Sequence, residues 1–559
     1  MTEMNDRNNR NQRNRMIIIG AGVAGLSATL ELARNGVTSI LVSDMPSERA
    51  QSVMAEGGIN ASGNVGNVKT DSPELHAEET MKAGRYLADY NAVSQMTATA
   101  PEIIKALFSA GMAFTLNEDG KPDVRAFGGQ SVKRTFFAGT NTGKQLMYVL
   151  IDQVRRYEAE GLVERYTGWM FLKLLHDCNQ VYGCVLEHPI TRERKVLYGK
   201  ILIASGGLNG MFGNATGSVR NTGAVTANLF ASGVKFANGE FIQYHPTTVT
   251  LHGKNMLISE AVRGEGGRLY VLEHAKPVYF MEEKYPELGN LMPRDVIARE
   301  EWLQIEQGKQ VYLDMSHLDK EVYEKRLKGV VEDCIHFLDL DPRKEPIPVT
   351  PGIHYFMGGI WVDANHRTSM RNLYAAGECA CQYHGANRLG GNSLLGALYG
   401  GSISAKSAME DNECNDGQAN LADDANVPNI HSVKDSFKDK EQIAGSYMEN
   451  WKHLQNIMKT GLGIIRSEKT IQSALSELNN LSEKIGQEYD PTATEAENQA
   501  LVDCCLLGKA MMLCALERKE SRGAHNRSDY PLESEEYQKQ TIAEWIDGKI
   551  SIHFQKAGE

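Results

Sequence analysis

Arginine, histidine and glutamate are concentrated in five short segments of this 559-residue chain. The segments are 243–247 (QYHPT), 259–267 (SEAVRGEGG), 293–295 (PRD), 354–359 (HYFMGG) and 384–394 (HGANRLGGNSL). One such residue alone is usually structural or on the surface, but the set is dense in cationic and hydrogen-bonding groups within an acidic protein. Two arginines and two histidines can hold two carboxylates, with arginine as the bidentate partner. The segments therefore predict a site for a small dianion.

A glycine-rich turn near the N-terminus predicts a dinucleotide site. Residues 16–19 form an apolar run that is followed at once by Gly20, Gly22 and Gly25, then by a helical pattern and a second strand at 39–43. In such a β-α-β unit the first glycine allows a tight turn and the second lets a pyrophosphate approach the backbone. The third lets helix and strand pack closely, and the helix N-terminus offers N–H groups to the phosphates.

Two later segments repeat the pattern of a strand followed by small residues, at 200–207 (KILIASGG) and 373–378 (LYAAGE). Each could be an ordinary buried strand with a glycine turn. Three such units in one chain instead favour a single nucleotide-binding domain assembled from discontinuous segments.

The last quarter of the chain is predicted to be helical. Apolar residues recur at helical spacing over 448–465 and again over 471–485. Thr494 and Glu497 have the spacing of a capping box, which would open a third helix running to about Arg518. We expect these three helices to form a small bundle.

Composition excludes several classes of protein. The formal net charge of −12 argues against a nucleic-acid partner held by phosphate contacts. The nine cysteines contain no C-x-x-C, so no metal centre, zinc ribbon, iron–sulfur cluster or attached haem is expected in this chain. Residues 1–15 are polar and lack a secretory pattern, and no segment reads as a membrane span. We therefore expect a cytoplasmic protein whose link to a membrane runs through a partner.

The ordered motifs resemble the flavoprotein subunit of the succinate dehydrogenase/fumarate reductase family, particularly the form found in Gram-positive bacteria. The resemblance covers about residues 16–531. Its most specific matches are AEGGIN at 55–60, FGGQS at 127–131, RGEGG at 263–267, HGANRLGGNSLLGALYGG at 384–401 and RKESRGAH at 518–525.

The resemblance implies an α/β fold with three main parts. A discontinuous Rossmann-like FAD-binding domain would occupy 16–239 and 354–410, with an inserted α+β capping domain at 240–353 that closes over the substrate. A C-terminal helical bundle would span 441–531. The remaining parts would be a disordered tail at 1–15, a linker at 411–440 and a C-terminal tail at 532–559.

The resemblance also implies FAD as the cofactor and assigns roles to individual positions. FAD would be held by Gly20, Gly22, Gly25, Ser43, Ser52, Ala55, Gly57, Gly58, Glu378, Ser393 and Leu394. The dicarboxylate, fumarate or succinate, would be bound by His245, Ser259, His354 and Arg388. Electrons would pass to or from an iron–sulfur subunit, which would connect to a membrane anchor carrying quinone and so place the protein on the inner face of the cell membrane.

In the same family pattern Arg294 would donate or accept the proton, and Glu260 and Arg263 would relay protons to it. Arginine has a pKa above about 12 and is a poor acid, so it needs a path that returns the proton. Glu260 lies three residues before Arg263, a spacing that lets the two meet on one helical face.

Three alternatives stay open. The chain could work oxidatively as a succinate dehydrogenase. It could resemble L-aspartate oxidase, which shares the fold and an R-x-E-S-R-G segment, although Gly390, Gly391 and Gly396 and the GGQS at 128–131 favour the succinate dehydrogenase type. It could also be a non-catalytic flavin-binding paralogue. The presence of all the cationic and histidine residues of the motifs argues against that alternative.

One position departs from the family. Most relatives carry a histidine that bonds covalently to the flavin, and the aligned residue here is Gln51. A carboxamide cannot attack the flavin methyl group as an imidazole can. We therefore expect FAD to be bound non-covalently and at a lower potential, which favours fumarate reduction over succinate oxidation.

Overall fold

The computed structural model describes residues 15–63, 71–177, 179–251, 253–413 and 440–558. Almost all of the expected N-terminal tail at 1–15 and of the expected linker at 411–440 lies outside the described residues. The first three residues of that linker, 411–413, instead belong to a helix that continues to Glu413.

A five-stranded parallel sheet forms the centre of the first domain, in the order β19-β10-β1-β2-β6. Its strands are β1 (Met16–Ile19), β2 (Ser39–Ser43), β6 (Val163–Thr167), β10 (Lys200–Ile203) and β19 (Leu373–Ala375). The three segments expected to repeat one theme therefore contribute strands to one sheet. β1 and β2 are buried along their whole length, which explains the unbroken apolar sequence of β1 and the apolar centre, Ile-Leu-Val, of β2.

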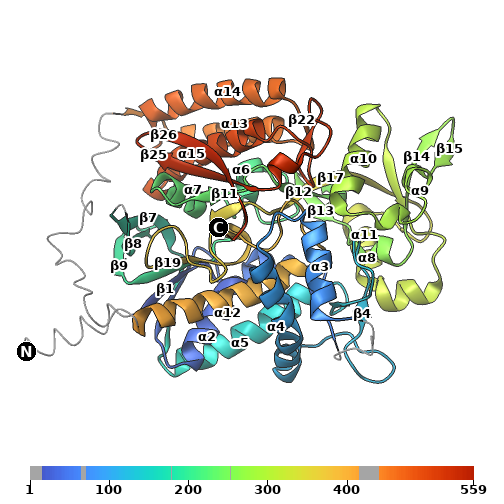
Figure 1. Cartoon of the computed structure of the whole chain (residues 1–559), viewed down its shortest axis with the longest axis horizontal. Helices are drawn as coiled ribbons and strands as arrows, with labels where there is room; N and C mark the ends of the chain where they lie inside the picture. Colours follow the sequence, from blue (N-terminus) through green and yellow to red (C-terminus); the bar gives the residue numbers. More distant parts are fainter. Residues whose placement is uncertain (1–14, 64–70, 178, 252, 414–439, 559) are drawn as a thin grey trace, which may run out of the picture.

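Different elements pack against the two faces of this sheet. Met16 and Ile18 pack with α2 (Val23–Arg34), α5 (Thr142–Ala159) and α12 (Asn392–Glu413), which run together beneath the sheet in Figure 1. Ile17 and Ile19 instead face an antiparallel meander. That meander consists of β7 (Met170–His176), β8 (Val181–Glu187) and β9 (Arg194–Tyr198).

Further helices and short strands complete this domain. They are α3 (Pro73–Ala83), α4 (Tyr90–Ser109), α6 (Asn209–Phe212), α7 (Ala224–Ala231) and the small strands β3 (Ile59–Asn60), β4 (Val124–Arg125) and β5 (Thr135–Phe136). The short 3-10 turn Gln51–Met54 lies against α5.

The inserted unit, on the right in Figure 1, has its own six-stranded antiparallel sheet and its own apolar core. Its strands are β12 (Ile242–Leu251), β13 (Lys254–Leu257), β14 (Arg268–Glu273), β15 (Lys276–Val278), β16 (Val311–Asp314) and β17 (Ile347–Phe356). Its helices are α8 (Ala261–Gly264), α9 (Phe280–Lys284), α10 (Arg294–Glu306) and α11 (Lys328–Leu338). β12 pairs with β17, with Gln243 opposite Tyr355 and His245 opposite Gly352, so two of the motif segments lie side by side.

Helices α13 (Ser446–Gly461), α14 (Glu468–Gln487) and α15 (Glu495–Glu517) form the C-terminal bundle. Thr494 caps α15 in the predicted capping box with Glu497. The helix expected to reach 465 ends at Gly461, because Ile465 joins a short strand that pairs with Asn526. Among the described helices α15 is long and apolar enough to cross a membrane, but most of it is buried within the protein, as is typical of a core helix.

The segment expected as a C-terminal tail is ordered into a hairpin of β25 (Gln540–Ile546) and β26 (Lys549–Gln555). β25 pairs with β11 (Phe236–Ala237), so the end of the chain extends a sheet that also contains β18 (Gly359–Trp361) and β20 (Ala380–Cys381). The hairpin thus ties the C-terminus to the segment that leads into the inserted unit.

Candidate active site

A cavity of about 880 Å³ lies between the parallel-sheet domain and the inserted unit. Most of the predicted site residues line it: Gly20, Gly22, Ser43, Ser52, Ala55, Gly57, Gly58, His245, Ser259, Glu260, Arg294, His354, Glu378, Arg388, Ser393 and Leu394. Gly25 and Arg263 do not. The volume suits a large cofactor together with a small substrate rather than a dicarboxylate alone.

The glycine turn leaves room only for backbone. Gly20 has φ +116°, and a Cβ there would come within 2.1 Å of the carbonyl oxygen of Ala204. A Cβ on Gly25 would come within 1.9 Å of the Gly20 carbonyl oxygen, so the third glycine lets the helix pack against the turn and does not face the cavity. The first residues of both α2 and α12 line the cavity. Two helix N-termini there favour negatively charged groups such as a pyrophosphate, so these residues fit FAD.

The Gln51 carboxamide is fixed by hydrogen bonds at the cavity wall. Its Oε1 accepts from Asn221 Nδ2 at 2.6 Å, Asn209 Nδ2 at 2.8 Å and the Ser218 amide at 3.2 Å. Its Nε2 donates to Glu378 Oε2 at 3.4 Å. The side chain therefore has four hydrogen-bond partners, which fix its position. The three partners from 209–221 were not expected from the sequence.

Two carboxyl groups that line the cavity have pKa values raised well above the ordinary value for glutamate. Burial raises the pKa of Glu378 to about 7, although the Phe356 amide donates to it. Burial, with the charge of Asp333, raises the pKa of Glu56 to about 8. Glu56 belongs to the AEGGIN segment, but nothing in its sequence marked it as a site residue.

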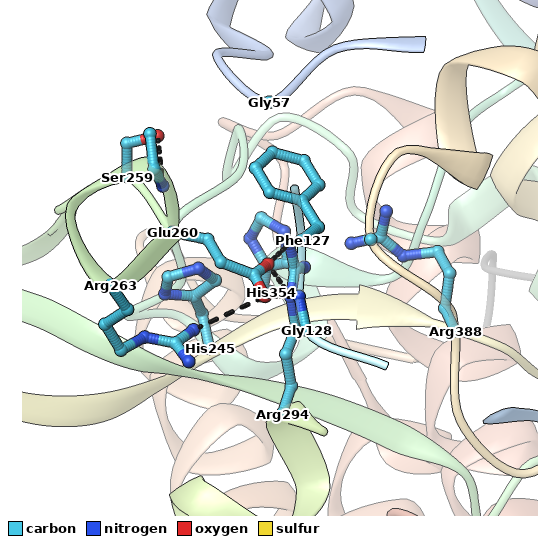
Figure 2. Close-up of polar contacts among 12 residues, drawn as sticks. Gly57, Phe127, Gly128, His245, Ser259, Glu260, Arg263, Arg294, His354 and Arg388 are labelled. Carbon is cyan, nitrogen blue, oxygen red and sulfur yellow. Dashed lines mark hydrogen bonds and ion pairs between the residues drawn. The ribbon is translucent and has the colours of Figure 1, made fainter. Parts of the chain in front are cut away.

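An ion-pair chain connects Arg294 to the interior of the inserted unit (Figure 2). Glu260 Oε2 accepts from Arg294 Nε at 2.8 Å and also from its Nη2, while Glu260 Oε1 lies 3.7 Å from Arg263 Nη2. Glu260 immediately precedes α8, and Arg263 follows within that short helix, so the predicted spacing brings them together. Burial alone would raise the pKa of Glu260, but Arg294 and Arg263 outweigh it and lower the pKa to about 2.

Gln243 connects the two arginines that face the cavity. Its Oε1 accepts from Arg294 Nη1 at 3.2 Å and from Arg388 Nη2 at 3.0 Å, and its Nε2 donates to the Arg388 carbonyl oxygen. The Arg388 guanidinium also lies 4.3 Å from the centre of the Tyr355 ring. Sequence reasoning included Gln243 in a motif but gave it no role, because a neutral amide carries no charge signal.

His245 and His354 lie next to each other with ring centres 5.1 Å apart. The Thr247 amide donates to His245 Nδ1, and the His354 Nδ1 lies 2.7 Å from the Thr216 hydroxyl. Burial and the nearby Arg294 hold the pKa of both histidines well below 6.5. Both rings are therefore neutral at pH 7 and contribute hydrogen bonds rather than charge.

The charges of the site suit a dianion. Burial and the charge of Arg294 lower the pKa of Arg388 to about 9, which leaves it protonated at neutral pH. Arg388, Arg294 and Arg263 together with the carboxylate of Glu260 leave two positive charges. The buried Arg388 Nε has no hydrogen-bond partner among the described residues, as expected of a group that binds a ligand. No group of three metal-ligating side chains occurs in the described part of the chain.

Comparison with known proteins agrees with this geometry. Residues 15–394 match the family described as FAD binding domain, and 451–557 match the one described as Fumarate reductase flavoprotein C-term. The chain is 36% identical to the succinate dehydrogenase flavoprotein subunit of Bacillus subtilis, over 96% of this chain and 94% of that protein. It is 32% identical to one chain of the fumarate reductase (CoM/CoB) of Methanothermobacter marburgensis, over 92% and 94%.

Solved structures share the whole architecture. A quinol-fumarate reductase with menaquinol molecules superposes with a TM-score of 0.87 at 28% identity, covering 97% of this chain and 98% of that one. Sdh1 of Mycobacterium smegmatis superposes with a TM-score of 0.83 at 28% identity, covering 97% and 95%. With its FAD-binding, capping and C-terminal helical domains, this chain belongs to the succinate dehydrogenase/fumarate reductase flavoprotein family of FAD-dependent oxidoreductases.

Proposed function

We propose that the chain is the flavoprotein subunit of a fumarate reductase, which interconverts fumarate and succinate and works mainly towards succinate. The observation that carries this proposal is the grouping of Arg388, His245, His354 and the Arg294–Glu260 pair around one cavity that also contains the glycine turn. FAD, when bound, supplies the hydride chemistry of the reaction.

Arg388 and the histidines would bind the two carboxylates of the substrate. Arg388 can pair bidentately with one carboxylate, and its position above the Tyr355 ring limits its movement. The neutral rings of His245 and His354, with the hydroxyl of Ser259, would hydrogen-bond the other carboxylate. Cationic groups on the substrate carboxylates also stabilise the negative charge that develops on the carbon skeleton during reduction.

Arg294 would donate the proton to the substrate carbon opposite the one that receives hydride. Its Nε and Nη2 atoms both donate to the Glu260 carboxylate, which would pass a proton received from Arg263 on to the Arg294 guanidinium after transfer. Arg263 would in turn give a proton to Glu260. It forms an ion pair with Glu260 and, unlike Glu260, does not line the cavity. Residues 240–353, which carry all three side chains, would act as the capping domain that closes over the substrate.

FAD would be bound without a covalent link. Gln51 takes the place of the family's flavin-linking histidine, and its carboxamide is already hydrogen-bonded to Asn209, Asn221 and Glu378. Without the electron-withdrawing histidyl link the flavin would be a stronger reductant, which supports the assigned direction.

The electron donor would be a separate iron–sulfur subunit that connects to a quinone-binding membrane anchor on the cytoplasmic side. The seven described cysteines are buried free thiols scattered through the fold. The 36% identity to the Bacillus subtilis protein supports the Gram-positive type of this family.

The test is a substrate panel on the purified protein with artificial dyes. Reduced viologen with fumarate should give the fastest turnover, and succinate with an oxidising dye a slower one. L-aspartate, as the substrate of the related oxidase class, should give none. Faster turnover of L-aspartate, or of succinate, would contradict the proposal.

A further inference from the structure

Gln243 is a buried, uncharged side chain to which the mechanism above assigns no role. It is 0% exposed and, unlike Arg294 and Arg388, does not line the cavity. Its single Oε1 atom accepts from Arg294 Nη1 at 3.2 Å and from Arg388 Nη2 at 3.0 Å. Figure 2 shows the two arginines reaching the site from different elements, Arg294 from α10 and Arg388 from the segment before α12. One neutral atom therefore bridges two cationic side chains from separate parts of the fold.

The orientation of this carboxamide is fixed by its other end. Gln243 Nε2 donates to Asn387 Oδ1 at 2.8 Å and to the Arg388 carbonyl oxygen at 2.9 Å. A backbone carbonyl oxygen can only accept, so the NH2 group must face it and the amide oxygen must face the arginines. A carboxylate in the same place would bring an oxygen against that carbonyl oxygen. The surroundings of the side chain therefore favour glutamine over glutamate.

Elsewhere in this chain a carboxylate bridges two arginines. Glu520, which is 0% exposed, accepts from Arg518 Nη1 at 2.9 Å and from Arg522 Nε at 2.7 Å. That carboxylate cancels one of the two positive charges. The amide of Gln243 meets the same geometric need, one acceptor for two guanidiniums, and cancels neither charge.

The charges that Gln243 leaves in place match those of a dianion. Arg294, Arg263 and Arg388, together with the single carboxylate of Glu260, leave two positive charges at the site. A dicarboxylate dianion balances both. A monoanion would leave one buried positive charge without a counter-ion, which is costly in a buried site.

We propose that Gln243 makes the site selective for a dianion, because it holds Arg294 and Arg388 together without cancelling either charge. This inference rests on the proposed function and specifies its substrate class. Fumarate should be strongly preferred to a monoanionic analogue of the same shape, such as its monomethyl ester. Gln243 is a positioning residue, since it contacts the arginines and does not line the cavity.

The test measures equilibrium binding to the oxidised, FAD-loaded full-length protein, followed by the flavin absorbance. Fumarate and monomethyl fumarate are titrated into the wild type, Gln243→Glu, Gln243→Met and Gln382→Glu. Gln382 is the matched control, because it is a buried glutamine that does not line the cavity and whose Nε2 also donates to a backbone carbonyl, that of Asp363. Turnover of fumarate by the wild type establishes the proposed function independently.

Gln243→Glu should weaken fumarate binding about 10²-fold and monoester binding by no more than about 10-fold, because the added charge opposes two substrate charges in fumarate and one in the ester. Gln243→Met changes no charge, so the ratio of the two affinities should stay within about twofold of the wild type. Its kcat for fumarate should fall about 10-fold, because Arg294 loses a partner that holds it in place. Gln382→Glu should keep both affinities and kcat near their wild-type values.

Equal losses of both affinities in folded Gln243→Glu would overturn the selectivity role, because they would show that only packing matters, and unchanged affinities would overturn it as well. A wild type that binds the monoester as tightly as fumarate would overturn the inference while leaving fumarate reduction intact. Normal kcat in Gln243→Met would overturn the positioning role, and this variant remains a test if Gln243→Glu does not fold. If the wild type neither binds nor reduces fumarate, the proposed function fails instead.

Discussion

Replacement of Glu260 by glutamine should destabilise the protein and slow its reaction at the same time. The carboxylate is 3% exposed and lies between two guanidiniums, so the variant leaves two buried positive charges without their counter-ion. The fall in the pKa of Glu260 from 4.5 to about 2 corresponds to ~3 kcal/mol of stabilisation. That agrees with the ~3–5 kcal/mol typical of breaking a buried ion pair.

The sign of the pH dependence follows from the lowered pKa. The stabilisation is complete above the unfolded pKa of 4.5 and is lost as the pH falls through about 2. Urea unfolding at pH 7 should therefore show a gap of ~3 kcal/mol between wild type and Glu260→Gln, and the gap should narrow between pH 4.5 and pH 2. Glu265→Gln is a suitable control, because its ion pair with Arg326, whose side chain is 35% exposed, predicts a change within ~1 kcal/mol.

Turnover of fumarate by Glu260→Gln should fall about 10²-fold, since the amide cannot carry a proton to Arg294. Fumarate binding should change less, because Glu260 does not hold the substrate carboxylates. The reasoning is refuted if the variant unfolds at the wild-type urea concentration at pH 7, or if it turns over at the wild-type rate.

Three further predictions concern the substrate, the cofactor and the electron path. Arg388→Leu should weaken fumarate binding by at least about 10²-fold in an equilibrium titration while FAD content stays normal, because one partner of a buried charge pair is removed. Fumarate affinity at the wild-type level would argue against Arg388 as a ligand of the substrate carboxylate. Acid precipitation should release the flavin into a yellow supernatant because Gln51 forms no covalent bond, and flavin retained in the pellet would contradict this. The purified chain should contain FAD but no stoichiometric iron and should not oxidise quinol, and an iron–sulfur signal in this single chain would count against a separate electron-transfer subunit.

Local sequence patterns predicted much of the fold. The glycine turn with its flanking strands, the strands at 200–203 and 373–375 in one sheet, and the Thr494 capping box depend on nearest neighbours and turn geometry. The first helix of the bundle is shorter than the sequence predicts: it ends at Gly461, and Ile465 instead pairs with Asn526 in a short strand, a contact that depends on tertiary structure.

The C-terminal hairpin has a local signal in its sequence. Asp547 and Gly548 both have positive φ, which is the turn that an Asp-Gly pair favours between two alternating strands. Its pairing with β11, about three hundred residues earlier, could not be read locally because it depends on long-range packing.

Within the candidate site, charged residues were easier to predict than the neutral ones that position them. Gln243 holds Arg294 and Arg388 through one carboxamide oxygen, a role that depends on three segments far apart in the sequence. The partners of Gln51 likewise follow from packing alone.

The most direct test of the account is the Arg294→Ala variant, measured for both fumarate binding and fumarate turnover. We expect FAD and fumarate to bind, while turnover at neutral pH falls by at least about 10²-fold because the proton donor is gone. Near-normal turnover at neutral pH would contradict the account, since it would remove Arg294, and with it the Glu260–Arg263 relay, from proton transfer.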